Sequence, residues 1–261
     1  MKILILNPNM SRQMTDLMVS TAGAAIPPDV ELEGMTADRG MPYISSRAEA
    51  LIAGNLVLEM IAERQDDVDA VVVAAFGDPG LLAARELFDL PLTGMAEASM
   101  LTACMLGKTF ALVTFSQNMR AWYEEAVAQA GLDTRCVGIC VPDAAFSSVA
   151  NVQAELESEI VETSRRAVSE LGADVVILAG APLTGLAGRI ADRVPVPVVD
   201  PIIAAVSQAQ SLLRLNVRSP SAGRFARPAG KPATGLPKAL AAQIERQAAP
   251  IERAKRRAAQ D

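Results

Sequence analysis

Four short polar segments in this sequence have the residue types of a small-molecule binding site. They are Asn7-Pro8-Asn9-Met10-Ser11, Phe76-Gly77-Asp78, Thr114 with Ser116, and Gly180-Ala181-Pro182. Backbone N–H groups and short polar side chains of this kind can hold a carbonyl or carboxylate group at the start of a helix. The alternative at each segment is a tight turn with a helix N-cap. The predicted binding residues are Asn9, Ser11, Phe76, Gly77, Thr114, Ser116, Gly180, Ala181 and Pro182.

The sequence contains no histidine, which restricts its acid–base chemistry. Ser-His and Cys-His nucleophile systems and histidine acids or bases are therefore excluded. Asp78 and Glu97 are candidate acids or bases, because a carboxyl group in a dry pocket has a raised pKa. Both also have structural alternatives. Asp78 before Pro79 is typical of a helix N-cap, and Glu97 suits the first turn of a helix.

The three cysteines are predicted to be packing thiols. Cys104 lies on an apolar helix face, and Cys136 and Cys140 lie in a predicted strand. An odd number of cysteines without metal-ligand spacing indicates free thiols in a reducing compartment, and no metal site. Trp122 and Tyr123 are likewise predicted to pack in the core or between lobes.

The polar segments would be positioned by the strands and helices that precede and follow them. Short runs of Val, Ile and Leu are typical of buried parallel strands. The predicted strands are Ile3–Leu6, Val30–Gly34, Val71–Ala75, Pro91–Gly94, Phe110–Val113, Thr134–Cys140, Val175–Ala179 and Pro197–Val199. The predicted helices include Met14–Ala25, Ala48–Arg64, Gly80–Leu87, Ala121–Ala130 and Val152–Leu171. Their alternation predicts βαβ units and parallel sheets.

The first four strands correspond to the second four in order and spacing. Ala75 occupies the same place in its half as Gly180 does in the other. Chance similarity between Ala/Val-rich segments is the alternative, but agreement over four strands favours duplication. Two similar lobes would turn the carboxyl ends of their strands, where ligands bind in parallel sheets, towards a shared cleft.

The overall composition limits the possible partners. A net charge of −6 with mixed signs argues against nucleic acid, and no run of about eighteen apolar residues predicts a membrane span. The first residues read as a strand, so we expect a cytoplasmic protein. We expect a first lobe from residues 1–98 with 201–236, a second lobe from 99–200, and a helical C-terminal extension at 237–261.

Taken in order, these motifs resemble the aspartate/glutamate racemase superfamily, in its hydantoin and allantoin racemase branch. The resemblance runs from Ile3 to about Leu236, and its motifs are Asn7-Pro8-Asn9, Ala75–Leu81, Gly94–Ala98, Gly180–Ala187 and Val199-Asp200-Pro201. It implies two pseudo-symmetric flavodoxin-like lobes, each with a four-stranded parallel sheet, and a ligand cleft between them. It also implies a small-molecule substrate, either a ureide or a carboxylate, a homo-oligomer, and no metal or organic cofactor.

The chemistry that this resemblance implies uses one cysteine at each of two equivalent strand ends. Here those positions carry Ala75 and Gly180, and neither can exchange a proton. The resemblance therefore implies ligand binding without the two-thiol mechanism. Tyr43 lies in a loop that closes over the cleft in this family. It joins Asp78, Glu97 and a bound water as a candidate substitute acid or base.

Three functions follow as hypotheses. The first is a cofactor-independent, racemase-like isomerase of hydantoin, allantoin or related α-substituted carbonyl compounds, with a non-cysteine acid or base. The second is a lyase, decarboxylase or hydrolase in the same cleft. The third is a non-catalytic small-molecule-binding protein. An ionisable side chain near Ala75 or Gly180 would favour an enzyme, and an apolar cleft would favour binding alone.

Overall fold

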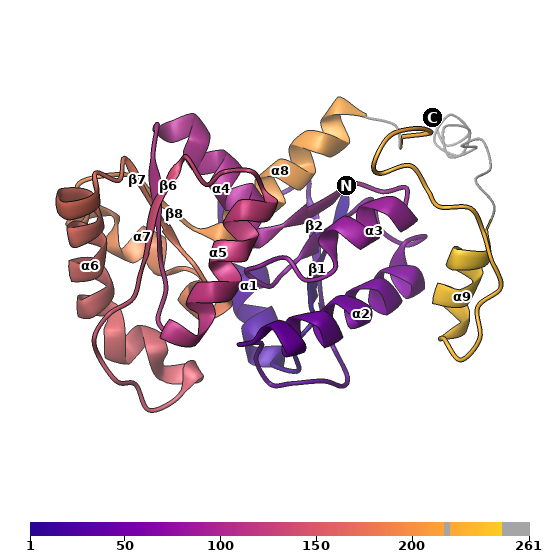
Figure 1. The fold of residues 1–261 in the computed structure, drawn as a ribbon, viewed down its shortest axis with the longest axis horizontal. Coiled ribbons are helices and arrows are strands. Elements are labelled where there is room, and N and C mark those ends of the chain that lie inside the picture. Colours follow the sequence, from indigo (N-terminus) through magenta and orange to yellow (C-terminus); the bar gives the residue numbers. More distant parts are fainter. Residues whose placement is uncertain (217–219, 247–261) are drawn as a thin grey trace.

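The computed structural model describes residues 1–216 and 220–246. These residues form two four-stranded parallel sheets (Figure 1). The strand orders are β2-β1-β3-β4 and β6-β5-β7-β8, so each strand of one sheet has a counterpart in the other. The strands are β1 (Lys2–Asn7), β2 (Glu31–Thr36), β3 (Ala70–Val73), β4 (Leu92–Gly94), β5 (Phe110–Val113), β6 (Cys136–Cys140), β7 (Val175–Leu178) and β8 (Val198–Val199). The predicted α/β fold with two parallel sheets is confirmed.

Helices connect the strands and cover both sheets. They are α1 (Arg12–Ala25), α2 (Arg47–Arg64), α3 (Leu81–Leu87), α4 (Met95–Leu106), α5 (Arg120–Gln129), α6 (Val152–Leu171), α7 (Leu186–Ile190), α8 (Pro201–Leu215) and α9 (Lys238–Glu245). Ser11 begins α1, where its Oγ accepts a hydrogen bond of 3.3 Å from the backbone N–H of Met14. A serine N-cap of this kind satisfies one of the free N–H groups at a helix start.

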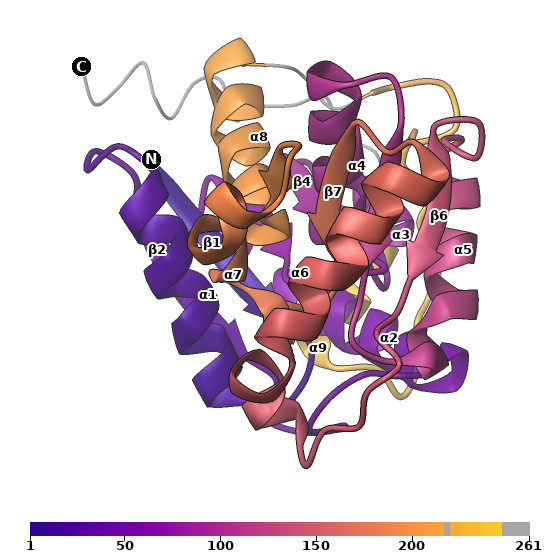
Figure 2. The ribbon, with the colours of Figure 1, turned by 90° about the vertical axis from the view of Figure 1, so that its left-hand side faces the viewer.

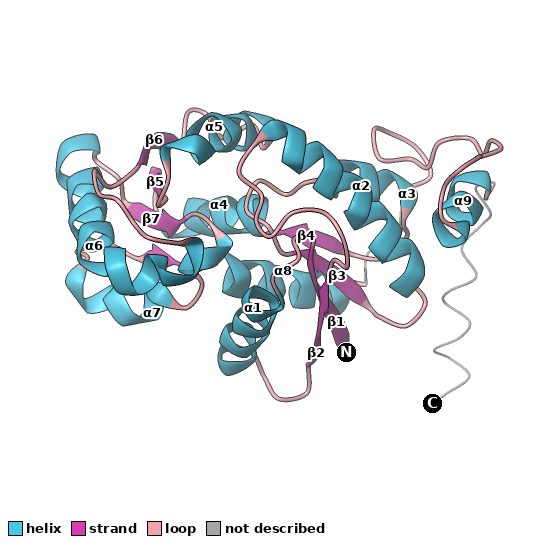
Figure 3. Ribbon diagram, turned by 90° about the horizontal axis from the view of Figure 1, so that it is seen from below, coloured by secondary structure: helices cyan, strands magenta, loops and turns pink. Residues whose placement is uncertain are grey.

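The first sheet is buried on both faces. Alternate side chains of β1 point to opposite sides, as the two-residue period of a strand requires. Ile3 and Ile5 join the core cluster that includes Met18 of α1, whereas Leu4 and Leu6 join the cluster formed with α2 and α3. Figure 3 shows α2 and α3 on one side of this sheet and α1 on the other. A sheet covered on both faces explains why its strands are continuous apolar runs.

The second sheet is covered by α6 on one face, and α4 and α8 connect the two lobes (Figure 2). Helix α8 packs on β3 and β4, while α4 packs against both α8 and β7. One core cluster therefore runs from the first lobe into the second. The domain boundaries at residues 98 and 200 stay a prediction.

The C-terminal segment crosses the first lobe. In α9, Leu240 is buried in the cluster of α2 and α3, and Nε2 of Gln243 donates a 2.6 Å hydrogen bond to the carbonyl of Leu87. The helix ends at Glu245. The rest of the predicted helical extension, residues 247–261, lies outside the described residues. Across the described parts of the chain, no helix combines the length and apolarity needed to cross a membrane.

Candidate active site between the two lobes

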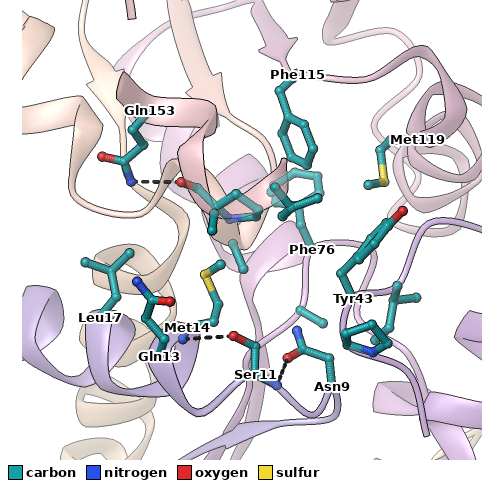
Figure 4. Close-up of a pocket in the computed structure, with 18 of the residues that line it drawn as sticks. Asn9, Ser11, Gln13, Met14, Leu17, Tyr43, Phe76, Phe115, Met119 and Gln153 are labelled. Carbon is teal, nitrogen blue, oxygen red and sulfur yellow. Dashed lines mark hydrogen bonds between the residues drawn. The ribbon is translucent and has the colours of Figure 1, made fainter. Parts of the chain in front are cut away.

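A cavity of about 540 Å³ lies where the carboxyl ends of the two sheets meet. Ala75 and Gly180 both line it, and each follows the last residue of its strand, β3 or β7, by two positions. The other lining residues are Asn9, Ser11, Gln13, Met14, Leu17, Pro42, Tyr43, Ile44, Phe76, Phe115, Met119, Trp122, Tyr123, Val149, Ala150, Gln153, Ala154, Ala181 and Pro182. Figure 4 shows side chains from both halves of the chain around this space.

Six of the nine predicted binding residues line this cavity: Asn9, Ser11, Phe76, Gly180, Ala181 and Pro182. The other three lie just outside it. Gly77 has φ +103° and faces the Trp122 indole so closely that a Cβ would overlap the ring. Thr114 is fully buried behind the cavity wall, and Ser116 is half-buried. A role for Gly77, Thr114 and Ser116 in binding stays a prediction.

The Asn7-Pro8-Asn9 turn is fixed by its own side chains. Asn7 Nδ2 donates to Asn9 Oδ1 at 3.0 Å, and Oδ1 also accepts from the Ser11 N–H at 2.8 Å (Figure 4). The amide oxygen of Asn9 is thereby used within the turn. Its Nδ2 donates no hydrogen bond within residues 1–216 and 220–246. Asn9 therefore presents a free N–H donor at the edge of the cavity.

Asp78 is buried next to the cavity but does not line it. Its two carboxylate oxygens accept from the N–H groups of Ala96 (2.9 Å) and Glu97 (2.7 Å) at the start of α4. Burial raises the pKa of Asp78 to about 7, although these two N–H groups oppose the shift. The carboxylate thus caps α4. Asp78 does not cap α3, the helix that follows Pro79. That helix begins at Leu81, and its N-cap residue is Gly80, whose backbone lies in the left-handed region.

Glu97 also lies outside the cavity. Its carboxylate pairs with the guanidinium of Arg85, whose Nη1 donates to Oε1 at 2.9 Å. Arg85 additionally donates to the carbonyl of Leu92. The pair borders a separate surface hollow between α3, α4 and α8. Catalytic roles for Asp78 and Glu97 stay predictions, and neither carboxylate reaches the ligand space in this structure.

Tyr43 does line the cavity, and its side chain is 45% exposed. Its loop is held to the Asn9 turn by a hydrogen bond of 2.9 Å from the Met10 N–H to the Met41 carbonyl. In Figure 4 the Tyr43 hydroxyl points towards Met119 of the second lobe. Of the three acid–base candidates, Tyr43 is the one whose side chain reaches the ligand space.

Tyr123 is the ionisable group that the sequence analysis assigned to packing. It is 2% exposed and lines the cavity, and its ring meets Phe76 edge-on at a centroid distance of 4.7 Å. Burial raises the pKa of Tyr123, so the phenol is protonated at neutral pH and can donate a hydrogen bond. Its position nine residues after Thr114, on the helix that follows the strand end, is a signal that could have suggested this role.

The cavity wall is electrically neutral. Among residues 1–216 and 220–246, no Asp, Glu, Lys or Arg lines it. Its polar side chains are Asn9, Ser11, Gln13, Tyr43, Tyr123 and Gln153. Gln153 of α6 is held by the loop that follows β7. Its Nε2 donates to the carbonyls of Pro182 and Thr184 at 2.8 Å each (Figure 4). Such a site suits an uncharged ligand with both hydrogen-bonding and apolar parts.

Comparison with known proteins agrees with this geometry. The sequence profile of the family described as Asp/Glu/Hydantoin racemase matches residues 3–209. The chain belongs to this family. A hydantoin racemase of Paenarthrobacter aurescens is 33% identical over 233 residues, which cover 88% of this chain and 99% of the relative.

Solved structures of the racemase family share the two-lobed arrangement. An allantoin racemase from Klebsiella pneumoniae has a TM-score of 0.85 and 32% identity, and the match covers 92% of this chain and 98% of the other. An allantoin racemase from Pseudomonas fluorescens has a TM-score of 0.84 and 29% identity, and the match covers 90% of this chain and 100% of the other. The resemblance read from the strand-end motifs is confirmed at the level of the family and its hydantoin and allantoin racemase relatives.

This member of the racemase family has no thiol in its cavity. Cys104 lies in α4, and Cys136 and Cys140 lie in β6, at the edge of the second sheet; all three are free. None of them lines the cavity, and burial raises the pKa of Cys136 and Cys140. Within the described residues, no cluster of three or more Asp, Glu or Cys side chains is placed to hold a metal ion.

Proposed function

We propose that this chain is a racemase-type isomerase that exchanges the proton on a carbon next to a carbonyl group in a hydantoin-like ring. The observation that carries the proposal is the single cavity shared by the strand ends at Ala75 and Gly180, in a chain of the Asp/Glu/Hydantoin racemase family. Hydantoin and allantoin racemases match this chain over nearly their full length. A duplicated fold can place donors on both sides of a planar intermediate.

The neutral wall supports a neutral ring as the substrate. A free amino acid would carry its carboxylate and ammonium group into a space without opposite charges, which costs several kcal/mol per ion. A cyclic ureide exposes only carbonyl and N–H groups, and Asn9 Nδ2 is free to bind one of those carbonyls. The apolar residues Met14, Leu17 and Met119 would accommodate a hydrocarbon substituent on the ring.

The acid–base chemistry of the proposed reaction uses no thiol of this chain. Ala75 and Gly180 stand where the family resemblance predicts cysteines, and the three actual cysteines lie elsewhere. Tyr43, Tyr123 and water are the groups available to the ligand space. The proposal includes catalysis without a metal or organic cofactor, a cytoplasmic location and assembly as a homo-oligomer, which are expectations from the family resemblance and composition.

Deuterium exchange tests the proposed function. We expect the protein in D₂O to exchange the C5 proton of (S)-5-benzylhydantoin at least about 10²-fold faster than the protein-free solution, the contribution of one positioned acid or base. Proton loss is followed by NMR, and inversion is followed by chiral chromatography. L-Aspartate and L-glutamate in parallel should show no protein-dependent exchange, because the cavity has no charged partner for them.

The fluorescence of Trp122, the only tryptophan, reports occupancy of the cavity that it lines. A hydantoin that changes this fluorescence without exchanging its proton would contradict isomerisation and favour the binding-only function. Exchange of aspartate rather than the neutral ring would contradict the substrate class.

A further inference from the structure

Gly180 lies beside the phenol of Tyr123 in the cavity wall. A Cβ placed on Gly180 would lie 3.5 Å from the Tyr123 hydroxyl oxygen and 2.9 Å from the ring of Phe115. The backbone of Gly180 has φ +124°, a conformation that side chains rarely adopt. Even a methyl side chain would press against Phe115, so glycine allows the backbone at this strand end to approach the phenol.

A second hydroxyl lies behind this position. Thr114 Oγ1 is fully buried and makes no hydrogen bond within the part of the chain that the structure describes. It lies near the Tyr123 phenol, where it opposes the rise that burial causes in the pKa of that phenol. Buried hydroxyls usually have partners, so Thr114 Oγ1 is a polar group left open beside the Tyr123 phenol.

Two backbone N–H donors also lie in this part of the cavity wall. The N–H groups of Gly180 and Ala181 donate to no acceptor within residues 1–216 and 220–246, and both residues line the cavity. The wall of the same cavity therefore contains one phenol and, beside it, the two backbone N–H groups of Gly180 and Ala181. Fixed donors without an acceptor at a ligand site are the arrangement that stabilises negative charge developing on an oxygen.

We propose that Tyr123 is a catalytic hydrogen-bond donor to the carbonyl oxygen of the substrate, at an oxyanion site formed with the backbone of Gly180 and Ala181. The inference rests on the proposed function. Hydroxide or water from solvent takes the proton from the ring carbon, and the C–H electron pair forms the carbon–carbon double bond of an enolate. The carbonyl π pair moves onto the oxygen that Tyr123 holds. Return of a proton to either face restores the carbonyl, and the phenol keeps its own proton throughout.

Tyr123→Phe removes the hydroxyl and keeps the aromatic ring. Removal of one oxyanion donor costs about 10²–10³-fold in kcat, so we expect that loss in exchange of 5-benzylhydantoin with a much smaller change in KM. Ser207→Ala, which removes an exposed hydroxyl from α8, should keep the wild-type rate. An exchange rate within about threefold of wild type for Tyr123→Phe would overturn the inference and leave the proposed function standing.

A binding measurement separates the two proposals. 5-Ethylbarbiturate is a planar enolate anion at neutral pH, whereas 5-ethylhydantoin is neutral. Trp122 fluorescence should show that the wild-type protein binds the barbiturate more tightly, and that Tyr123→Phe loses at least about tenfold of that affinity, as for one hydrogen bond to a charged group. This result without any hydantoin exchange would refute the isomerase and keep the anion-binding role of Tyr123. Equal barbiturate affinity in both proteins, or no binding to the wild type, would overturn the inference.

Discussion

Gly94→Ala is expected to destabilise the protein by about 3–5 kcal/mol at a pH above the Asp78 pKa of about 7, where this carboxylate is a buried charge that would lose its partners. Gly94 has an ordinary extended backbone, with φ −120° and ψ 154°, so alanine is excluded there by space alone. Its Cβ would overlap the carboxylate of Asp78. Movement of Asp78 would break both of its hydrogen bonds to the first turn of α4. Equilibrium unfolding in urea, followed by circular dichroism, measures the change.

Gly23→Ala in α1 is the matched control, because nothing lies within 4 Å of the added Cβ. Alanine is favoured over glycine inside a helix by about 1 kcal/mol, so this variant should be as stable as wild type or slightly more stable. If Gly94→Ala unfolded within about 1 kcal/mol of wild type, Asp78 would not be the cap on which the start of α4 depends.

Gly180→Ala is expected to lower hydantoin exchange by about 10²-fold or more, the effect of blocking one oxyanion donor. The methyl group would lie 2.9 Å from the Phe115 ring and 3.5 Å from the Tyr123 hydroxyl, so it would displace the side chains around the phenol that is proposed to hold the substrate carbonyl. The left-handed backbone at Gly180 adds a strain of about 1–3 kcal/mol, which should appear as reduced stability. Steady-state exchange rates and a thermal melt of the same sample separate the two effects.

Gly188→Ala in α7 provides the comparison for this variant, since an added Cβ there meets no atom within 4 Å. It should keep both the exchange rate and the melting temperature of the wild type. A folded Gly180→Ala protein that exchanges at the wild-type rate would show that the space beside Tyr123 is not used by the substrate.

The strand-end part of the site could be predicted from the sequence because parallel sheets place strand ends together. Ala75, Gly180 and Asn9 follow directly from the runs of Val, Ile and Leu that precede them. Pseudo-symmetry was a weaker guide. Ser116 follows the predicted strand Phe110–Val113 at the spacing with which Asn9 follows Ile3–Leu6, yet Ser116 does not line the cavity. The turn after β5 instead places Phe115 in the wall.

Side chains that reach the site from helices could not be predicted in the same way. Tyr123 has the spacing of a core residue on α5, and only the three-dimensional packing of α5 brings its hydroxyl close to Gly180. The partner of Asp78 was equally hidden. Asp78 precedes Pro79 as an N-cap would, but its left-handed φ of 49° turns the carboxylate to α4 rather than to the next helix. The positions of the Tyr123 hydroxyl and the Asp78 carboxylate are both decided by long-range packing, which local residue preferences do not encode.

The central claim is that this chain isomerises a neutral ring without a thiol, and a cysteine-free variant tests it most directly. Cys104→Ala, Cys136→Ala and Cys140→Ala together remove all three cysteines, none of which lines the cavity. The folded triple variant is expected to exchange the C5 proton of 5-benzylhydantoin in D₂O at the rate of the wild-type protein. Loss of exchange in a variant that keeps the wild-type fold and still binds the ring, as reported by Trp122, would contradict the claim.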